Sequence, residues 1–146
     1  MDSPQNWFEK LAVQDWSKAV FEGAHRFSKV RPDILAALAA ENAEVRSAAV
    51  ATFNEANDAE AHNEVVALLG DPDPHVCEEV IEYIGEFPAK SDVNALLQLL
   101  QQRQYLFPAS SALQKLYGGS GPLISGEESE SEIAAYIEEW EQLAGY

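Results

Sequence analysis

Residues 71–85 read DPDPHVCEEVIEYIG, and they carry the clearest indication of the fold. Its prolines and aspartates are typical of a junction between two helices, because aspartate accepts hydrogen bonds from free amides and proline suits the first helical position. We predict that Gly70 ends one helix in the left-handed conformation, and that Asp73 caps a new helix starting at Pro74. Apolar residues then recur at spacings of three and four, which predicts one buried face. That face consists of Val76, Val80, Ile81 and Ile84.

The same pattern recurs along the chain with a period of about 31 residues. Apolar quartets within residues 34–38, 65–69 and 96–100 align with one another, and residues 45–53 align with residues 76–84. After one residue of slippage, residues 112–116 match as well. These recurrences predict helical hairpins that bury their apolar faces only against their neighbours, as the units of a solenoid do. A looser, earlier copy places Val20, Phe21, Ala24 and Phe27 on a similar helix.

Part of this pattern resembles a HEAT repeat. Residues 73–76, 80–81 and 84–85 are similar to its second helix, and residues 42–45 form a looser copy. HEAT repeats often carry arginine or lysine after the valine, so a polar contact between repeats is expected at Arg46 and not at Cys77. The resemblance implies an all-α fold, a short right-handed α-solenoid of about four HEAT-like hairpins plus a closing C-terminal helix. It also implies that the second helices line a concave surface, which serves binding more often than catalysis.

The flanking sequence completes one predicted domain spanning residues 1–146. Residues 1–30 are predicted to form an N-terminal capping hairpin, in which Trp16 is one of the aromatic fillers, and residues 31–117 the core repeats. The Gly- and Ser-rich residues 118–126 are predicted to form a loop, and residues 127–146 a C-terminal capping helix with Trp140 on its apolar stripe.

The chain is strongly acidic. It holds 25 acidic and 9 basic side chains, for a formal net charge of -16. Residues 47–89 contain ten carboxylates and no lysine or arginine. Such a charge repels nucleic acid phosphates and attracts basic proteins, so we expect a basic protein partner and no direct nucleic acid binding. The alternative is that the acidity serves only to keep the protein in solution.

Polar residues on the helix predicted from Pro74 suggest where a partner binds. His75, Glu79 and Glu82, followed by Glu86, stand at spacings of four, three and four, which aligns them in one row beside the apolar face. The functional interpretation is an acidic strip that binds lysine and arginine side chains, and the alternative is an ordinary solvated face. The candidate partner-binding residues are His75, Glu78, Glu79, Glu82, Glu86, Glu44, Glu55, Ser111 and Gln114.

The sequence carries no pattern that favours catalysis. His25, His62 and His75 are scattered, and the His-Glu pairs of HEAT-like hydroxylases are missing, so we expect neither a metal nor a cofactor. The single cysteine, Cys77, lies among carboxylates that raise a thiol pKa, which favours a structural thiol over a nucleophile. The sequence shows no export signal and no apolar run of about 18 residues, and its single cysteine fits a reducing compartment, so we expect a cytoplasmic location without membrane contact.

We therefore expect a protein-binding module with an acidic recognition surface and no enzymatic activity. The most specific hypothesis is an inhibitor or immunity protein that neutralises a basic partner such as a nuclease toxin, because small acidic inhibitors imitate the charge of the substrate. The first alternative is a general HEAT-like scaffold or adaptor that binds a peptide or protein. A HEAT-like lyase is a less favoured alternative.

Overall fold

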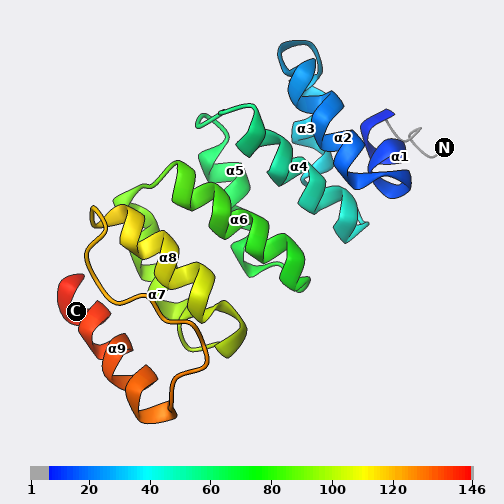
Figure 1. The fold of residues 1–146 in the computed structure, drawn as a ribbon. Helices are drawn as coiled ribbons and strands as arrows, with labels where there is room; N and C mark the ends of the chain where they lie inside the picture. Colours follow the sequence, from blue (N-terminus) through cyan, green and yellow to red (C-terminus); the bar gives the residue numbers. More distant parts are fainter. Residues whose placement is uncertain (1–6, 146) are drawn as a thin grey trace. The chain divides into compact units, whose positions relative to one another are not determined.

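The structure is a computed structural model that describes residues 7–145. Within that range all regular secondary structure is helical (Figure 1), which confirms the predicted all-α class of a short HEAT-like α-solenoid. The chain divides into two compact units, Met1–Tyr83 and Ile84–Tyr146, and the division falls inside the helix α6 (Pro74–Glu86). The α-helices are α1 (Trp7–Gln14), α2 (Trp16–His25), α3 (Phe27–Ala37), α4 (Ala43–Glu55), α5 (His62–Val66), α6 (Pro74–Glu86), α7 (Val93–Leu99), α8 (Leu106–Leu116) and α9 (Glu130–Leu143), and the short 3-10 helices are η1 (Ala67–Gly70), η2 (Lys90–Asp92) and η3 (Arg103–Tyr105).

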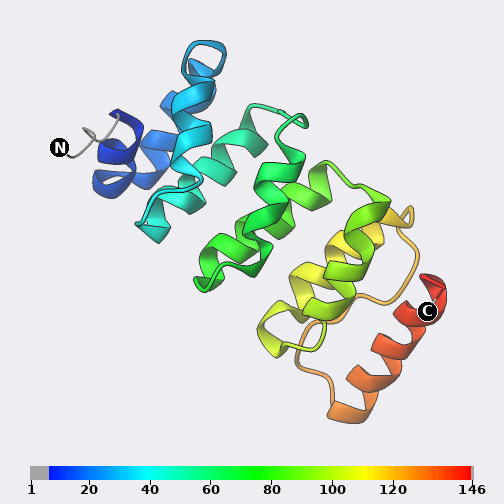
Figure 2. The ribbon, with the colours of Figure 1, turned by 180° about the vertical axis from the view of Figure 1, so that it is seen from behind.

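The first unit is built around α4, which packs against α1, α2 and α3 (Figures 1 and 2). Residues 47–53 of this helix are all buried, and most of them are small, so neighbouring helices can approach closely. Gly23 of α2 is one place of close approach. A Cβ atom there would lie 2.9 Å from Cγ2 of Thr52 and 3.2 Å from the ring of Phe8. Gly23 therefore allows α2 to lie directly on α4.

The junction before α6 forms largely as predicted. Oδ1 of Asp73 accepts hydrogen bonds from the amides of His75 at 2.9 Å and Val76 at 3.3 Å, and Pro74 is the first helical residue. The prediction for Gly70 is wrong, because this residue ends η1 without a positive φ. The chain instead leaves the helix through extended Asp71 (φ -60, ψ 138), a conformation favoured in a residue that precedes proline.

The core of the first unit contains most of the predicted apolar face of α6. Val76, Val80 and Ile81 are each at most 1% exposed, which confirms their placement. Cys77 is buried too, and its thiol donates to the carbonyl of Leu69 at 3.2 Å. Phe21, part of the looser copy of the pattern, differs from this buried face, since its side chain is 67% exposed. The helix α2 buries Ala19, Val20 and Gly23 instead.

The second unit packs α7 against α8 and also against α9. Trp140 of α9 is fully buried, and its indole Nε1 donates to the carbonyl of Pro122 at 2.6 Å. Ser110 fixes the same irregular segment, residues 117–129, because its hydroxyl accepts the amide of Ile124 at 3.0 Å. Gly121, with φ +99, lies so close to the Trp140 ring that a Cβ atom would clash with it. The division into capping segments and core repeats stays a prediction.

Candidate partner-binding surface

The exposed side of α6 carries three carboxylates in close succession. Glu78 and Glu82 are exposed, whereas the side chain of Glu79 is only 14% exposed. Nε2 of His75, one turn earlier, lies 3.6 Å from Oε1 of Glu79, and its own side chain is 53% exposed. This arrangement brings His75 and Glu79 together as a pair on the outer side of the helix, flanked by two further negative charges.

The environment of Glu79 disfavours its charge. Burial, followed by the charges of Glu82 and Glu78, raises the pKa of Glu79 to about 7. In residues 7–145 no lysine or arginine lies within ion-pair distance of these three carboxylates. Their mutual repulsion is therefore not offset by a fixed cation in the described part of the chain.

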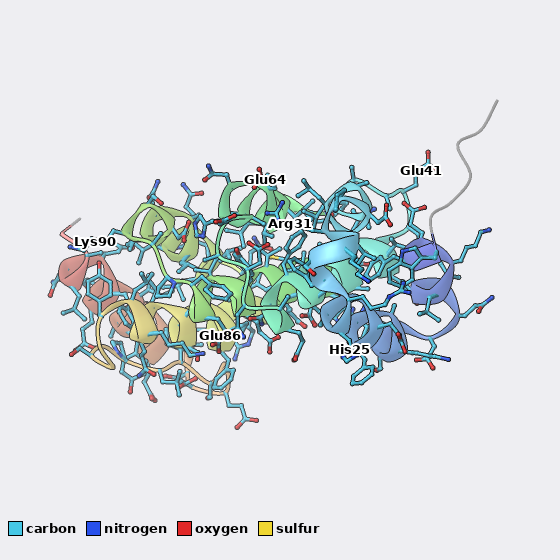
Figure 3. All side chains as sticks on the ribbon, turned by 90° about the horizontal axis from the view of Figure 1, so that it is seen from above. His25, Arg31, Glu41, Glu64, Glu86 and Lys90 are labelled. Carbon is cyan, nitrogen blue, oxygen red and sulfur yellow. The ribbon has the colours of Figure 1, made fainter. Side chains whose placement is uncertain are left out.

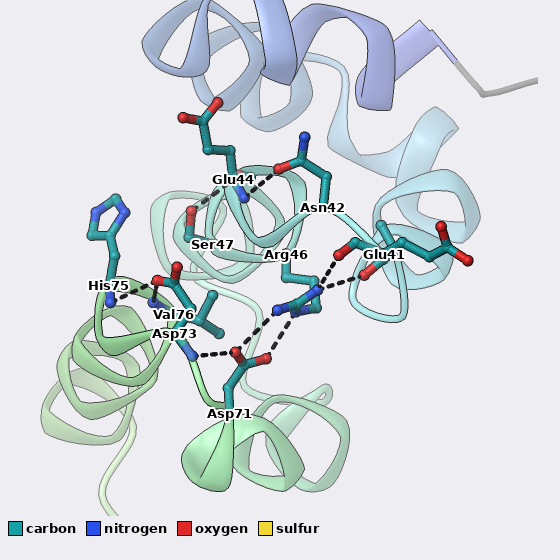
Figure 4. A network of polar contacts seen from close by, with 10 residues as sticks. Glu41, Asn42, Glu44, Arg46, Ser47, Asp71, Asp73, His75 and Val76 are labelled. Carbon is teal, nitrogen blue, oxygen red and sulfur yellow. Dashed lines mark hydrogen bonds and ion pairs between the residues drawn. The ribbon is translucent and has the colours of Figure 1, made fainter.

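A network of ion pairs and backbone hydrogen bonds positions the start of α6 (Figure 4). Arg46 of α4 holds Asp71 with two bonds, Nε–Oδ2 at 2.8 Å and Nη2–Oδ1 at 3.1 Å, while its Nη1 donates to the carbonyls of Ala40 and Glu41 at 2.8 and 2.7 Å. Asp71 also accepts the amide of Asp73 at 2.9 Å. Burial acts to raise the pKa of Asp71, but the hydrogen bonds from Arg46 and the Asp73 amide hold it below its usual value. The junction that presents His75 is thus fixed by charge-assisted bonds.

Trp16 of α2 joins this surface, although the sequence suggested only a filler of the capping hairpin. Its ring centroid lies 5.7 Å from that of His75, and its Nε1 donates to the hydroxyl of Ser47 at 2.9 Å. That hydroxyl in turn donates to the carbonyl of Glu44 at 3.0 Å. One aromatic side chain therefore connects α2, α4 and α6 on the side where the carboxylates lie.

A groove with a volume of about 540 Å³ opens along α2 beside Trp16. Its apolar part includes Phe21, the most exposed large apolar side chain in residues 7–145. The Phe21 ring is stacked on the ring of His25, with centroids 6.1 Å apart and an angle of 3° between the planes. His25 is labelled in Figure 3. The residues lining the groove are Trp16, Ser17, Val20, Phe21, Ala24, His25 and Glu55.

The structure assigns the remaining predicted residues to different surroundings. Glu44 is exposed in the first turn of α4, and Glu55, at the end of the same helix, lines the groove. Glu86, Ser111 and Gln114 belong to the second unit. There Glu86 lies 3.6 Å from Nζ of Lys115, and the amide of Gln114 donates to the carbonyl of Gly121 at 3.0 Å. Glu86 and Gln114 are therefore already engaged within their own unit.

Comparison with known proteins supports the architecture directly. Residues 31–116, more than half of the chain, match the family described as HEAT repeats. The chain belongs to the HEAT-repeat family. It matches no curated protein and no solved structure. HEAT repeats are helical scaffolds for protein interaction and are typically non-catalytic.

The HEAT-repeat match contains all nine predicted partner-binding residues but none of the three aromatic residues of α2 described above. Trp16, Phe21 and His25 precede the matched region, so the family match does not point to them. Within residues 7–145 of this HEAT-repeat chain, no three His, Cys, Asp or Glu side chains are grouped so that they could hold a metal ion. Among the described helices, none has the length and apolar character needed to cross a membrane.

Proposed function

We propose that this HEAT-repeat protein binds a basic protein through the acidic side of α6. The single observation that carries the proposal is Glu79, which is held with little exposure between Glu78 and Glu82 and has no lysine or arginine partner in residues 7–145. The specific form of the proposal is an inhibitor or immunity protein that neutralises a basic partner such as a nuclease toxin. His75, Glu44 and Glu55 are proposed as further members of the surface in the first unit.

The physical argument rests on the cost of placing like charges together. Burial and the charges of Glu82 and Glu78 disfavour the ionised form of Glu79, and a lysine or arginine from a partner would offset the charge repulsion. A net charge of -16 would also accelerate the encounter with a positively charged protein. Both effects weaken as salt rises, because counterions screen exposed charges beyond about 8–10 Å at physiological ionic strength.

The groove beside Trp16 favours a second candidate function, a general adaptor that binds an apolar peptide. Phe21 at 67% exposure and the apolar lining supplied by Val20 and Ala24 are the observation that supports it. In that case the carboxylates of α6 would serve as a solvated coat, and their removal would leave binding unchanged.

The test is capture of partners from the native host on immobilised full-length protein, followed by affinity measurement with the purified partner. Three proteins are compared: wild type, the double variant E79K/E82K, and the control E138K/E139K, which changes net charge equally on exposed positions of α9. We expect a basic partner that elutes with salt, with affinity reduced at least about tenfold by E79K/E82K and much less by the control. An equal loss of affinity in E79K/E82K and in E138K/E139K would contradict the proposal. It would also be contradicted if the partner stayed bound at high salt and bound E79K/E82K as tightly as wild type.

A further inference from the structure

We infer that the groove on α2 receives an apolar side chain of the partner, and that this side chain is flanked by lysine or arginine. The inference rests on the proposed function and adds the chemistry of the bound segment. It follows from three observations in the first unit: an apolar cavity at the surface, a carboxylate at its edge, and an aromatic ring shared with the acidic side of α6.

The first observation is the shape and lining of the groove. Val20 and Ala24 lie one turn apart on α2, and the exposed ring of Phe21, stacked on that of His25, lines the same groove. A volume of about 540 Å³ exceeds that of any single side chain, so the groove can accept an aromatic or branched aliphatic residue together with its neighbours. Isolated exposed apolar residues are common, but here the exposed ring lines a hollow together with Val20 and Ala24, so an apolar side chain seated there would contact all three.

The second observation is the charge around the groove. Glu55, the last residue of α4, is exposed and lines the cavity, while the lining contains no lysine or arginine. Its carboxylate lies at the C-terminus of a helix, where the helix dipole is also negative. A cationic side chain next to the apolar anchor would therefore be attracted, whereas an acidic one would be repelled.

The third observation is the continuity between the groove and the acidic side of α6. Trp16 lines the groove, and its ring centroid lies 5.7 Å from that of His75, whose Nε2 is 3.6 Å from Glu79. A segment that seats an apolar residue against Phe21 thus has carboxylates available in two directions, Glu55 at the groove and Glu79 beyond Trp16. This separates the segment from a purely apolar peptide, which would gain nothing from either carboxylate.

Fluorescence anisotropy with three short labelled peptides tests the inference on the full-length protein. The first peptide carries a phenylalanine–leucine pair flanked by lysines, the second replaces that pair by glycine and serine, and the third replaces the lysines by glutamates. We expect the first peptide to bind at least about tenfold more tightly than either control peptide. We also expect Phe21→Ala to weaken the first peptide about five- to tenfold without affecting the second. Val13→Ala, which removes another exposed apolar side chain outside the lining, is the matched control.

The outcomes separate this inference from the function on which it rests. Equal binding of the first and second peptides would overturn the inference and leave recognition by charge in place. Equal binding of the first and third peptides would overturn the basic character of the segment and would count against the proposed function as well. No binding of the first peptide up to about 1 mM would also overturn the inference. Should Phe21→Ala lower the melting temperature, Ser17→Gln provides a second test, because it places a larger uncharged side chain at an exposed position of the groove and should weaken binding of the first peptide.

Discussion

Arg46 and Asp71 form a bidentate ion pair that connects α4 to the junction before α6, with N–O distances of 2.8 and 3.1 Å. The side chain of Asp71 is only 4% exposed and that of Arg46 only 15%. The guanidinium also binds the two backbone carbonyls that precede α4. One side chain therefore stabilises both the entry to α4 and the entry to α6.

Replacing Arg46 is expected to destabilise the first unit. Arg46→Met leaves the Asp71 carboxylate nearly buried without a cation, which should lower the free energy of unfolding by about 2 kcal/mol. Arg46→Lys keeps the charge but loses the paired geometry, so an intermediate loss is expected. Urea denaturation measures both, with Lys29→Met at an exposed position as the control. If Arg46→Met unfolded at the same urea concentration as the control, the ion pair would not be a stabilising contact.

Tyr83→Phe removes one buried hydrogen bond without changing the packing of the ring. The Tyr83 hydroxyl donates to the carbonyl of Asp58 at 2.6 Å, and the side chain is fully buried. Burial raises its pKa to about 12, so the phenol remains a donor at all ordinary pH values. We expect a loss of about 1 kcal/mol in the free energy of unfolding. The half-buried Tyr136 supplies the control, and an equal effect of Tyr136→Phe would show that the Tyr83 bond is not responsible.

Glu79 should make stability fall as pH rises. Its folded pKa of about 7 lies above the ordinary value of 4.5, so between these pH values the folded state binds a proton that the unfolded state has released. Raising the pH through this window therefore lowers the free energy of unfolding. Glu79→Gln should be more stable than wild type at pH 8 by about 1 kcal/mol, a figure reduced for solvent screening, and equal to it near pH 4. Thermal melting across this pH range tests the difference, and Glu138→Gln on the exposed face of α9 should show none.

Two glycines of the irregular segment in the second unit should differ sharply when replaced by alanine. Gly119 and Gly121 both have positive φ, but only at Gly121 would a Cβ atom meet the Trp140 ring. Gly119→Ala should cost about 1 kcal/mol from backbone strain, whereas Gly121→Ala should cost about 3 kcal/mol because it also displaces a fully buried indole. Equal melting temperatures of the two variants would refute the close contact.

The sequence was sufficient to predict the parts of the fold that depend on local signals. Asp73 and Pro74 start α6 as expected, since capping and proline geometry involve only neighbouring residues. The buried faces follow from the spacing of apolar residues for the same reason. Gly70 shows the limit, because the preference of a residue before proline at Asp71 overrode the left-handed cap.

The candidate surface was predictable only along α6. The row of carboxylates follows from helical spacing, but the low exposure of Glu79 depends on tertiary packing, which the spacing does not encode. Trp16 and His75 meet through the fold and share no local motif, so nothing in the sequence connects them. Phe21 lies beside Val20 in an apolar pair, and only the packing of α2 decides which of the two is exposed.

Gly23 and Phe21 stand two positions apart on α2, but Gly23 is enclosed by neighbouring side chains and Phe21 is exposed. The first lies against Thr52 and Phe8 with no space for a larger side chain, whereas the second points into solvent at the groove. Among descendants of this protein, position 23 should therefore almost always remain glycine. The residue at position 21 should be free to change whenever the partner changes. A single helix would then hold a slowly evolving face and a rapidly evolving face, so that new specificity could arise without any change in the fold.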